Sequence, residues 1–144
     1  MSETAVLPET AVPSETAAPA ATLRSALTWF EIPTADFDRA RRFYETIFET
    51  ALVEHPFGEA RVAVFPYDRP GVGGCLDEGS ASRPSAEGTV VYFDAEGRLD
   101  RTLERVEAAG GRIAVPKTAL PPGMGWVAHV VDSEGNRVGL HSIS

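Results

Sequence analysis

The chain has 144 residues, a length typical of a single globular domain. Its formal net charge is −8, and no cluster of Lys and Arg interrupts the acidic sequence, which argues against a nucleic-acid or anionic membrane partner. No apolar run is long enough to span a bilayer. Cys75 is the single cysteine, so the fold uses no internal disulfide, and this cysteine content fits a cytoplasmic location.

The N-terminal residues differ in composition from the rest of the chain. Residues 1–22 consist mostly of Ala, Thr, Pro, Ser and Glu, contain no Lys or Arg, and repeat a degenerate Glu-Thr-Ala motif. They lack the positive start and the apolar core of a secretory signal, and their prolines interrupt any helix. We therefore expect residues 1–25 to form a disordered acidic tail and residues 26–143 to form one domain.

The first half of that domain predicts a strand, a helix and further strands. Apolar residues alternate through residues 26–33, which favours a strand. Asp36 is placed to cap a helix that continues to residue 48, with apolar side chains on one face at helical spacing. Short strands are then expected at residues 52–53, 61–65 and 72–76, with a turn at residues 55–58.

The second half repeats this order. Residues 89–93 are nearly all β-formers and predict a strand. A helix is expected from Leu99 to Ala109, where two glycines end it. The last strands are expected at residues 113–115, 126–131 and 137–141, with a turn at residues 132–136.

A unit used twice, over residues 26–80 and 86–143, constrains the architecture. One such unit is too small to bury its apolar face alone, so the two must pack together. Consecutive strands with short turns favour antiparallel pairing and an α+β fold. We expect a curved sheet with the helices on its outside and a pocket on its inner face.

Several motifs, taken in this order, resemble those of one known family. They are Trp29-Phe30-Glu31-Ile32-Pro33-Thr34-Ala35-Asp36, Arg42-Phe43-Tyr44-Glu45, Glu107-Ala108-Ala109-Gly110-Gly111 and Asp132-Ser133-Glu134-Gly135-Asn136-Arg137-Val138-Gly139-Leu140. Together they resemble the vicinal oxygen chelate superfamily, the group of glyoxalases, bleomycin-resistance proteins and extradiol dioxygenases. The resemblance implies paired βαβββ modules that form an incomplete barrel around a cavity. It also implies a homodimer.

The resemblance further implies four positions for the ligands of a divalent metal ion, on the first and last strands of each module. In this chain they fall on Trp29, on Gly73 or Gly74, on Thr89 and on Gly139. Trp, Gly and Thr are not competent ligands for a catalytic divalent ion. We therefore expect a protein with no metal and no other cofactor.

The alternation of side chains along a strand predicts which residues line the cavity. Trp29 and Glu31 share one face, and His141 shares the face of Gly139. Across the turn, Trp126 is predicted on that same face and His129 on the opposite one. The predicted ligand-binding residues are Trp29, Glu31, Thr89, Trp126, Gly139 and His141. Two indoles and a carboxylate suit a planar, partly polar or cationic organic ligand.

Three functions are compatible with this cavity. The first is sequestration of a small organic molecule without metal, as in a resistance protein. The second is a cofactor-free isomerase, lyase or cyclase in which Glu31 and His141 act as catalytic acid and base. The third is a metal-dependent glyoxalase or dioxygenase with unusual ligands. Purely structural roles are also open, with Glu31 paired to Arg61 or Arg137 and His141 as a packing residue.

Overall fold

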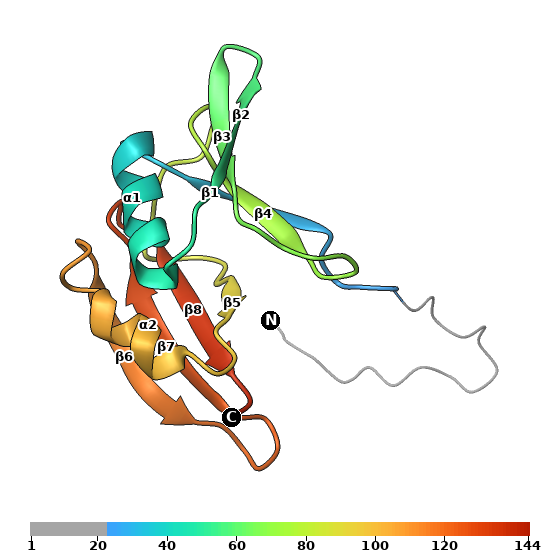
Figure 1. The fold of residues 1–144 in the computed structure, drawn as a ribbon, viewed down its shortest axis with the longest axis vertical. Helices are drawn as coiled ribbons and strands as arrows, with labels where there is room; N and C mark the ends of the chain where they lie inside the picture. The colour runs from blue at the N-terminus through green and yellow to red at the C-terminus, as the bar shows by residue number, and fades with distance from the viewer. Residues whose placement is uncertain (1–22) are drawn as a thin grey trace, which may run out of the picture.

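The computed structural model describes residues 23–144 (Figure 1). The predicted tail, apart from residues 23–25, lies outside the described residues. Neither helix within residues 23–144 is long and apolar enough to cross a membrane.

Both halves of the domain have the same order and the same sheet topology. The first contains β1 (Trp29–Pro33), α1 (Phe37–Phe48), β2 (Val53–Phe57), β3 (Ala60–Val64) and β4 (Gly73–Asp77). The second contains β5 (Tyr92–Asp94), α2 (Leu99–Arg105), β6 (Arg112–Ala119), β7 (Trp126–Val131) and β8 (Arg137–Ser142). The sheets have the orders β1-β4-β3-β2 and β5-β8-β7-β6. In each, the first strand is parallel to the last and the other pairs are antiparallel. The α+β class with paired βαβββ modules is therefore confirmed.

Several predicted bounds are wrong. His55 belongs to β2, so only Gly58 and Glu59 turn the β2–β3 hairpin. Strand β5 begins at Tyr92 and not at Thr89, because its parallel pairing with β8 starts there. Strand β6 continues through Pro116, since β6 is the edge strand of its sheet and Pro116 lies where the register with β7 shifts, so the proline is not a paired position of the ladder. Helix α2 ends at Arg105, four residues before its predicted end at 109.

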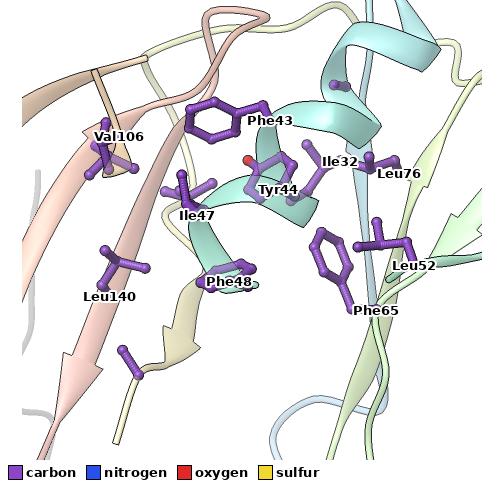
Figure 2. Packing of buried hydrophobic residues seen from close by; sticks show 14 of the residues in the cluster. Ile32, Phe43, Tyr44, Ile47, Phe48, Leu52, Phe65, Leu76, Val106 and Leu140 are labelled. Atoms are coloured by element: carbon purple, nitrogen blue, oxygen red, sulfur yellow. The ribbon is translucent and has the colours of Figure 1, made fainter. Parts of the chain in front are cut away.

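Helix α1 lies between the two sheets (Figure 2). Asp36 caps it as predicted, since its carboxylate accepts a hydrogen bond from the Arg39 N–H at 3.0 Å. Six of its 12 residues are buried, a broader apolar surface than one sheet needs. Side chains of α1 pack toward Leu140 on one side and toward Leu76 on the other. The two sheets are therefore separate and together form an incomplete barrel. The prediction of one curved sheet with both helices on its outside is wrong.

Aromatic rings form much of the core where the modules meet. Tyr44 packs edge-on against Phe65 with ring centroids 5.3 Å apart, and it lies 5.7 Å from Phe93. Phe30 of β1 meets Phe93 of β5 edge-on at 5.5 Å. These contacts bring the edge strands of the two sheets close together and leave a cleft beside them.

A buried polar network joins the modules next to this aromatic core. The Tyr44 hydroxyl donates to Oδ2 of Asp132 at 2.6 Å. The other oxygen of Asp132 accepts the backbone N–H groups of Glu134 and Asn136 at 2.9 and 2.8 Å. The Asn136 amide donates to the Pro33 carbonyl at 2.9 Å. Burial, followed by the charge of Asp132, raises the pKa of Tyr44 well above its usual value, so the hydroxyl stays a donor.

Glu134 of the same turn binds the start of α1. Its carboxylate accepts the backbone N–H groups of Ala35 and Asp36 at 2.9 and 2.6 Å and the Arg39 Nε–H at 2.8 Å. Burial acts to raise the pKa of Glu134, but these hydrogen bonds outweigh it and the pKa is lowered. The carboxylate also compensates the positive end of the helix dipole.

Tyr44→Phe should destabilise the protein by about 1–3 kcal/mol, because Asp132 loses a donor while it stays buried. Urea unfolding followed by circular dichroism measures this loss. Tyr67→Phe is the matched control, since Tyr67 is exposed and its hydroxyl has no hydrogen-bond partner among residues 23–144. Equal stability of the two variants would contradict the role given to the network.

Acidification should remove the contribution of Glu134 to stability. Its folded pKa is lowered from about 4.5, so the contribution is complete above that pH and is lost as the pH falls through the folded value. The free energy of unfolding of Glu134→Gln should therefore fall less steeply with acid than that of the unsubstituted chain. Glu104→Gln, which removes an exposed carboxylate with no partner in the described part of the chain, is the control. Parallel curves for Glu134→Gln and the unsubstituted chain would contradict this assignment.

Candidate functional site

A cleft of about 630 Å³ lies between the modules. This volume is in the range of sites for small organic molecules. Module one contributes Phe30, Phe65 and the β3–β4 connection, and module two contributes Tyr92 and Phe93. The cleft lies beside the aromatic contacts between β1 and β5. A cavity between the modules was predicted, but the six predicted ligand-binding residues, Trp29, Glu31, Thr89, Trp126, Gly139 and His141, do not line this cleft.

The cleft combines an aromatic floor with charged groups. Asp68, Asp94 and Arg98 line it. The Arg98 Nη1 donates to the Phe48 carbonyl at 3.0 Å, and no carboxylate of residues 23–144 forms an ion pair with this guanidinium. One oxygen of Asp94 accepts the Glu96 N–H at 2.9 Å. An apolar floor with charged groups around it suits an organic molecule that carries its own polar groups.

Each sheet also has a face turned away from the helices, here called its open face. On the open face of the first sheet, Trp29 lies opposite Gly73, and the Tyr67 ring covers this glycine. On the open face of the second sheet, Tyr92 lies opposite Gly139, and its own ring covers that glycine. A Cβ atom at either glycine would overlap the ring above it. In both modules, therefore, a tyrosine ring lies over a glycine of the last strand.

Of the metal-ligand positions implied by the family resemblance, Trp29, Gly73 and Gly139 lie on these open faces. The register of β5 with β8 places Tyr92 opposite Gly139, whereas Thr89 is exposed and precedes the strand. A ligating side chain at Gly73 or Gly139 would collide with an aromatic ring. Within residues 23–144, no three His, Cys, Asp or Glu side chains lie close enough to hold a metal ion. The residues present do not fit the divalent metal that the resemblance implies.

Trp29 and Glu31 share the open face of the first sheet, as predicted, but Glu31 is exposed and does not line the cleft. Neither arginine considered for it is its partner. Arg61 forms its closest ion pair with Glu78 at 2.8 Å. Arg137 donates to a backbone carbonyl and contacts a histidine.

Cys75, next to Glu31 in the strand register, is a buried packing residue. The pKa of its thiol is raised to about 11, mainly by burial; a hydrogen bond from Trp29 acts in the opposite direction, and the nearby carboxylates of Glu31 and Asp77 contribute to the rise. The thiol is therefore protonated at neutral pH and unsuited to nucleophilic chemistry.

The predicted face of Trp126 is wrong. His129 pairs with Gly139, and Trp126 pairs with Ser142, so Trp126 lies on the opposite face from Gly139 and His141. Five residues separate the first paired positions, 131 and 137, and a shift of one residue in this register exchanges the faces of every side chain. The Trp126 ring instead lies 4.8 Å from the Lys117 ammonium, in a cation–π contact.

His141 lies on the open face of the second sheet, where its Nε2 is 2.8 Å from the Met124 carbonyl. A carbonyl only accepts, so this nitrogen carries the proton and donates it to Met124. His141 does not line the cleft, and no contact joins it to Glu31 within the described residues. The structure therefore does not bring the predicted catalytic pair together.

Sequence reasoning missed a cluster on the same open face. The Tyr92 hydroxyl lies 2.7 Å from Nε2 of His129, and Nδ1 of His129 lies 3.3 Å from Nη1 of Arg137. Burial, with the nearby charge of Arg137, lowers the pKa of His129. Gly139 was the one residue in the sequence analysis that pointed to this part of the sheet. Its two neighbours on the adjacent strands are Tyr92 and His129, but the sequence alone did not give these pairings.

Comparisons with known proteins agree with this fold. The search of curated proteins found no match. Among solved structures, FosX, a fosfomycin resistance protein from Listeria monocytogenes, matches with a TM-score of 0.61 and 20% identity over 85% of this chain and 95% of that one. A glyoxalase-related enzyme from Fulvimarina pelagi matches with a TM-score of 0.59 and 22% identity over 83% and 88% of the two chains.

A glyoxalase/bleomycin resistance protein from Albidiferax ferrireducens T118 matches with a TM-score of 0.63 and 16% identity over 82% of this chain and 99% of that one. These similarities show a shared fold. The family model for the Glyoxalase/Bleomycin resistance protein/Dioxygenase superfamily matches residues 26–140, and the chain therefore belongs to that superfamily.

Proposed function

We propose that this protein binds a small organic molecule in the cleft between its modules, without a metal ion, and acts by sequestration. The observation that carries the proposal is the combination of an aromatic cleft of about 630 Å³ with rings in place of metal ligands. Sequestration needs a complementary pocket and no catalytic group. The cleft supplies the aromatic area from which small-ligand affinity mainly comes.

The cleft favours a planar, partly polar ligand. Phe30 and Phe93 offer ring edges and faces for stacking, and Arg98 and Asp94 offer charged groups beside them. A preference for a purely cationic ligand no longer has support, because neither tryptophan lines the cleft.

The neighbouring FosX structure is a complex with Mn(II) and 1S,2S-dihydroxypropylphosphonic acid. We carry over from it only the binding of a small molecule by this fold. We do not carry over the metal, because the ligand positions that the family resemblance implies fall on Trp29, on Gly73 or Gly74, on Thr89 and on Gly139 here. The separation of Glu31 from His141 also gives no support to an acid–base reaction by that pair.

We further propose a homodimer, which the family resemblance implies. The first sheet exposes apolar side chains at Trp29, Val53 and Phe57, and the exposed fraction of Phe57 is 71%. A second copy would cover this surface.

We also propose a cytoplasmic location, because the single cysteine is buried and unpaired.

A substitution that fills the cleft should abolish ligand binding. Val72 lines the cleft with an exposed fraction of 37%, so Val72→Trp places an indole in the ligand's space. A library of planar drug-like molecules is first screened by thermal shift, and the dissociation constants of the hits are then measured by calorimetry. We expect Val72→Trp to weaken them at least about tenfold, or about 1.4 kcal/mol. Ile113→Trp, at an equally exposed position outside the cleft, should leave them unchanged.

Metal ions should have no effect on the protein. We expect no stoichiometric Mn²⁺, Fe²⁺, Ni²⁺, Co²⁺ or Zn²⁺ in untagged protein analysed by mass spectrometry, and no rise in Tm when these ions are added. A chelator should leave ligand affinity unchanged. One tightly bound ion per chain, with a rise in Tm that chelation reverses, would overturn the metal-free site.

A further inference from the structure

The second sheet carries a chain of three hydrogen-bonding side chains across its open face. Tyr92 starts on β5, and its ring crosses Gly139 of β8 to reach His129 of β7. Arg137 of β8 contacts the other side of the imidazole. The two distances are 2.7 Å for Tyr92 Oη to His129 Nε2 and 3.3 Å for His129 Nδ1 to Arg137 Nη1.

The Arg137 guanidinium determines which nitrogen of His129 carries a proton. Arginine has donors only, so Nδ1 of His129 must accept from Arg137 and carries no proton. The single proton of the neutral imidazole is then on Nε2. It is donated to the Tyr92 oxygen, the other hydrogen-bond partner of the imidazole within residues 23–144. The lowered pKa of His129 agrees with a neutral ring.

This arrangement leaves the phenol proton of Tyr92 without an acceptor in residues 23–144, because His129 is already the donor to that oxygen. The Tyr92 side chain lines the cleft, and its exposed fraction is 48%. On the basis of the proposed ligand cleft, we propose that the Tyr92 O–H binds an acceptor oxygen, a carbonyl or an oxyanion, of a ligand that extends from the cleft over the open face of the second sheet. His129 and Arg137 are positioning residues that direct this proton outward.

Module one supports the assignment by contrast. The Tyr67 ring lies over Gly73, as the Tyr92 ring lies over Gly139. The Tyr67 hydroxyl, however, has no hydrogen-bond partner among the described residues. A free phenol can rotate and either donate or accept. Tyr92 is held as a donor, so the acceptor oxygen of the ligand is assigned to the open face of the second sheet, next to the cleft.

The first test reads the proton positions directly. The ¹⁵N shifts of the imidazole rings are recorded on the full chain at neutral pH, and His129→Gln identifies the signals of His129 among the three histidines. We expect a neutral ring with the proton on Nε2. Arg137→Gln should remove the fixed tautomer and give a mixture. A proton on Nδ1, or a charged ring, would overturn the inference.

The second test uses two probes of the same shape, acetophenone and α-methylstyrene, which differ by a carbonyl oxygen in place of a methylene group. Their dissociation constants are measured by NMR titration. We expect acetophenone to bind about fivefold more tightly, the effect of one net hydrogen bond. Tyr92→Phe should bring the ratio to about one, whereas Tyr67→Phe should keep it.

The outcomes separate this inference from the proposed function. Equal affinities for the two probes in the unsubstituted chain would overturn the role of Tyr92 and leave the cleft as a binding site. An affinity ratio that survives Tyr92→Phe would do the same. Failure of both probes to bind would count against the cleft itself, and the inference would fall with it.

Discussion

The carboxylate of Asp132 is the group on which the relative placement of the modules depends. It is 4% exposed, and it is satisfied by the Tyr44 hydroxyl and by two backbone N–H groups of its own turn. A buried carboxylate that loses its partners costs several kcal/mol. The hydrogen bond between Asp132 and Tyr44 therefore favours one position of the module-two turn on α1 of module one. Because this contact fixes the two sheets relative to each other, the cleft has a defined shape.

Tyr44 links the buried polar network of Asp132 to the aromatic floor of the cleft. Its hydroxyl belongs to the Asp132 network, while its ring packs against Phe65 and Phe93, both of which line the cleft. The core and the candidate site thus share a residue. A ligand in the cleft would rest on rings whose positions are set by a hydrogen bond on their far side.

The sequence was sufficient for features that depend on local patterns. The repeated order of elements, the cap at Asp36 and the buried face of α1 all follow from spacing and side-chain chemistry within a few residues. Features that depend on the register between neighbouring strands were not predicted correctly. Counting faces across the 132–136 turn fails when the register is off by one residue, and this error placed Trp126 in the cavity and His129 outside it. The contact of Tyr92 with His129 joins residues 37 positions apart and has no local signature.

The rings that lie on Gly73 and Gly139 restrict how this chain could change during evolution. A single substitution that restores a metal ligand at either glycine introduces a side chain into space that Tyr67 or Tyr92 already fills. The first step toward a metal ligand at either position therefore requires the tyrosine ring to leave its place over the glycine. Both tyrosines line the cleft, so this movement also changes the shape of the cleft. The two glycine–tyrosine pairs thus couple any such substitution to a rearrangement of the proposed binding site.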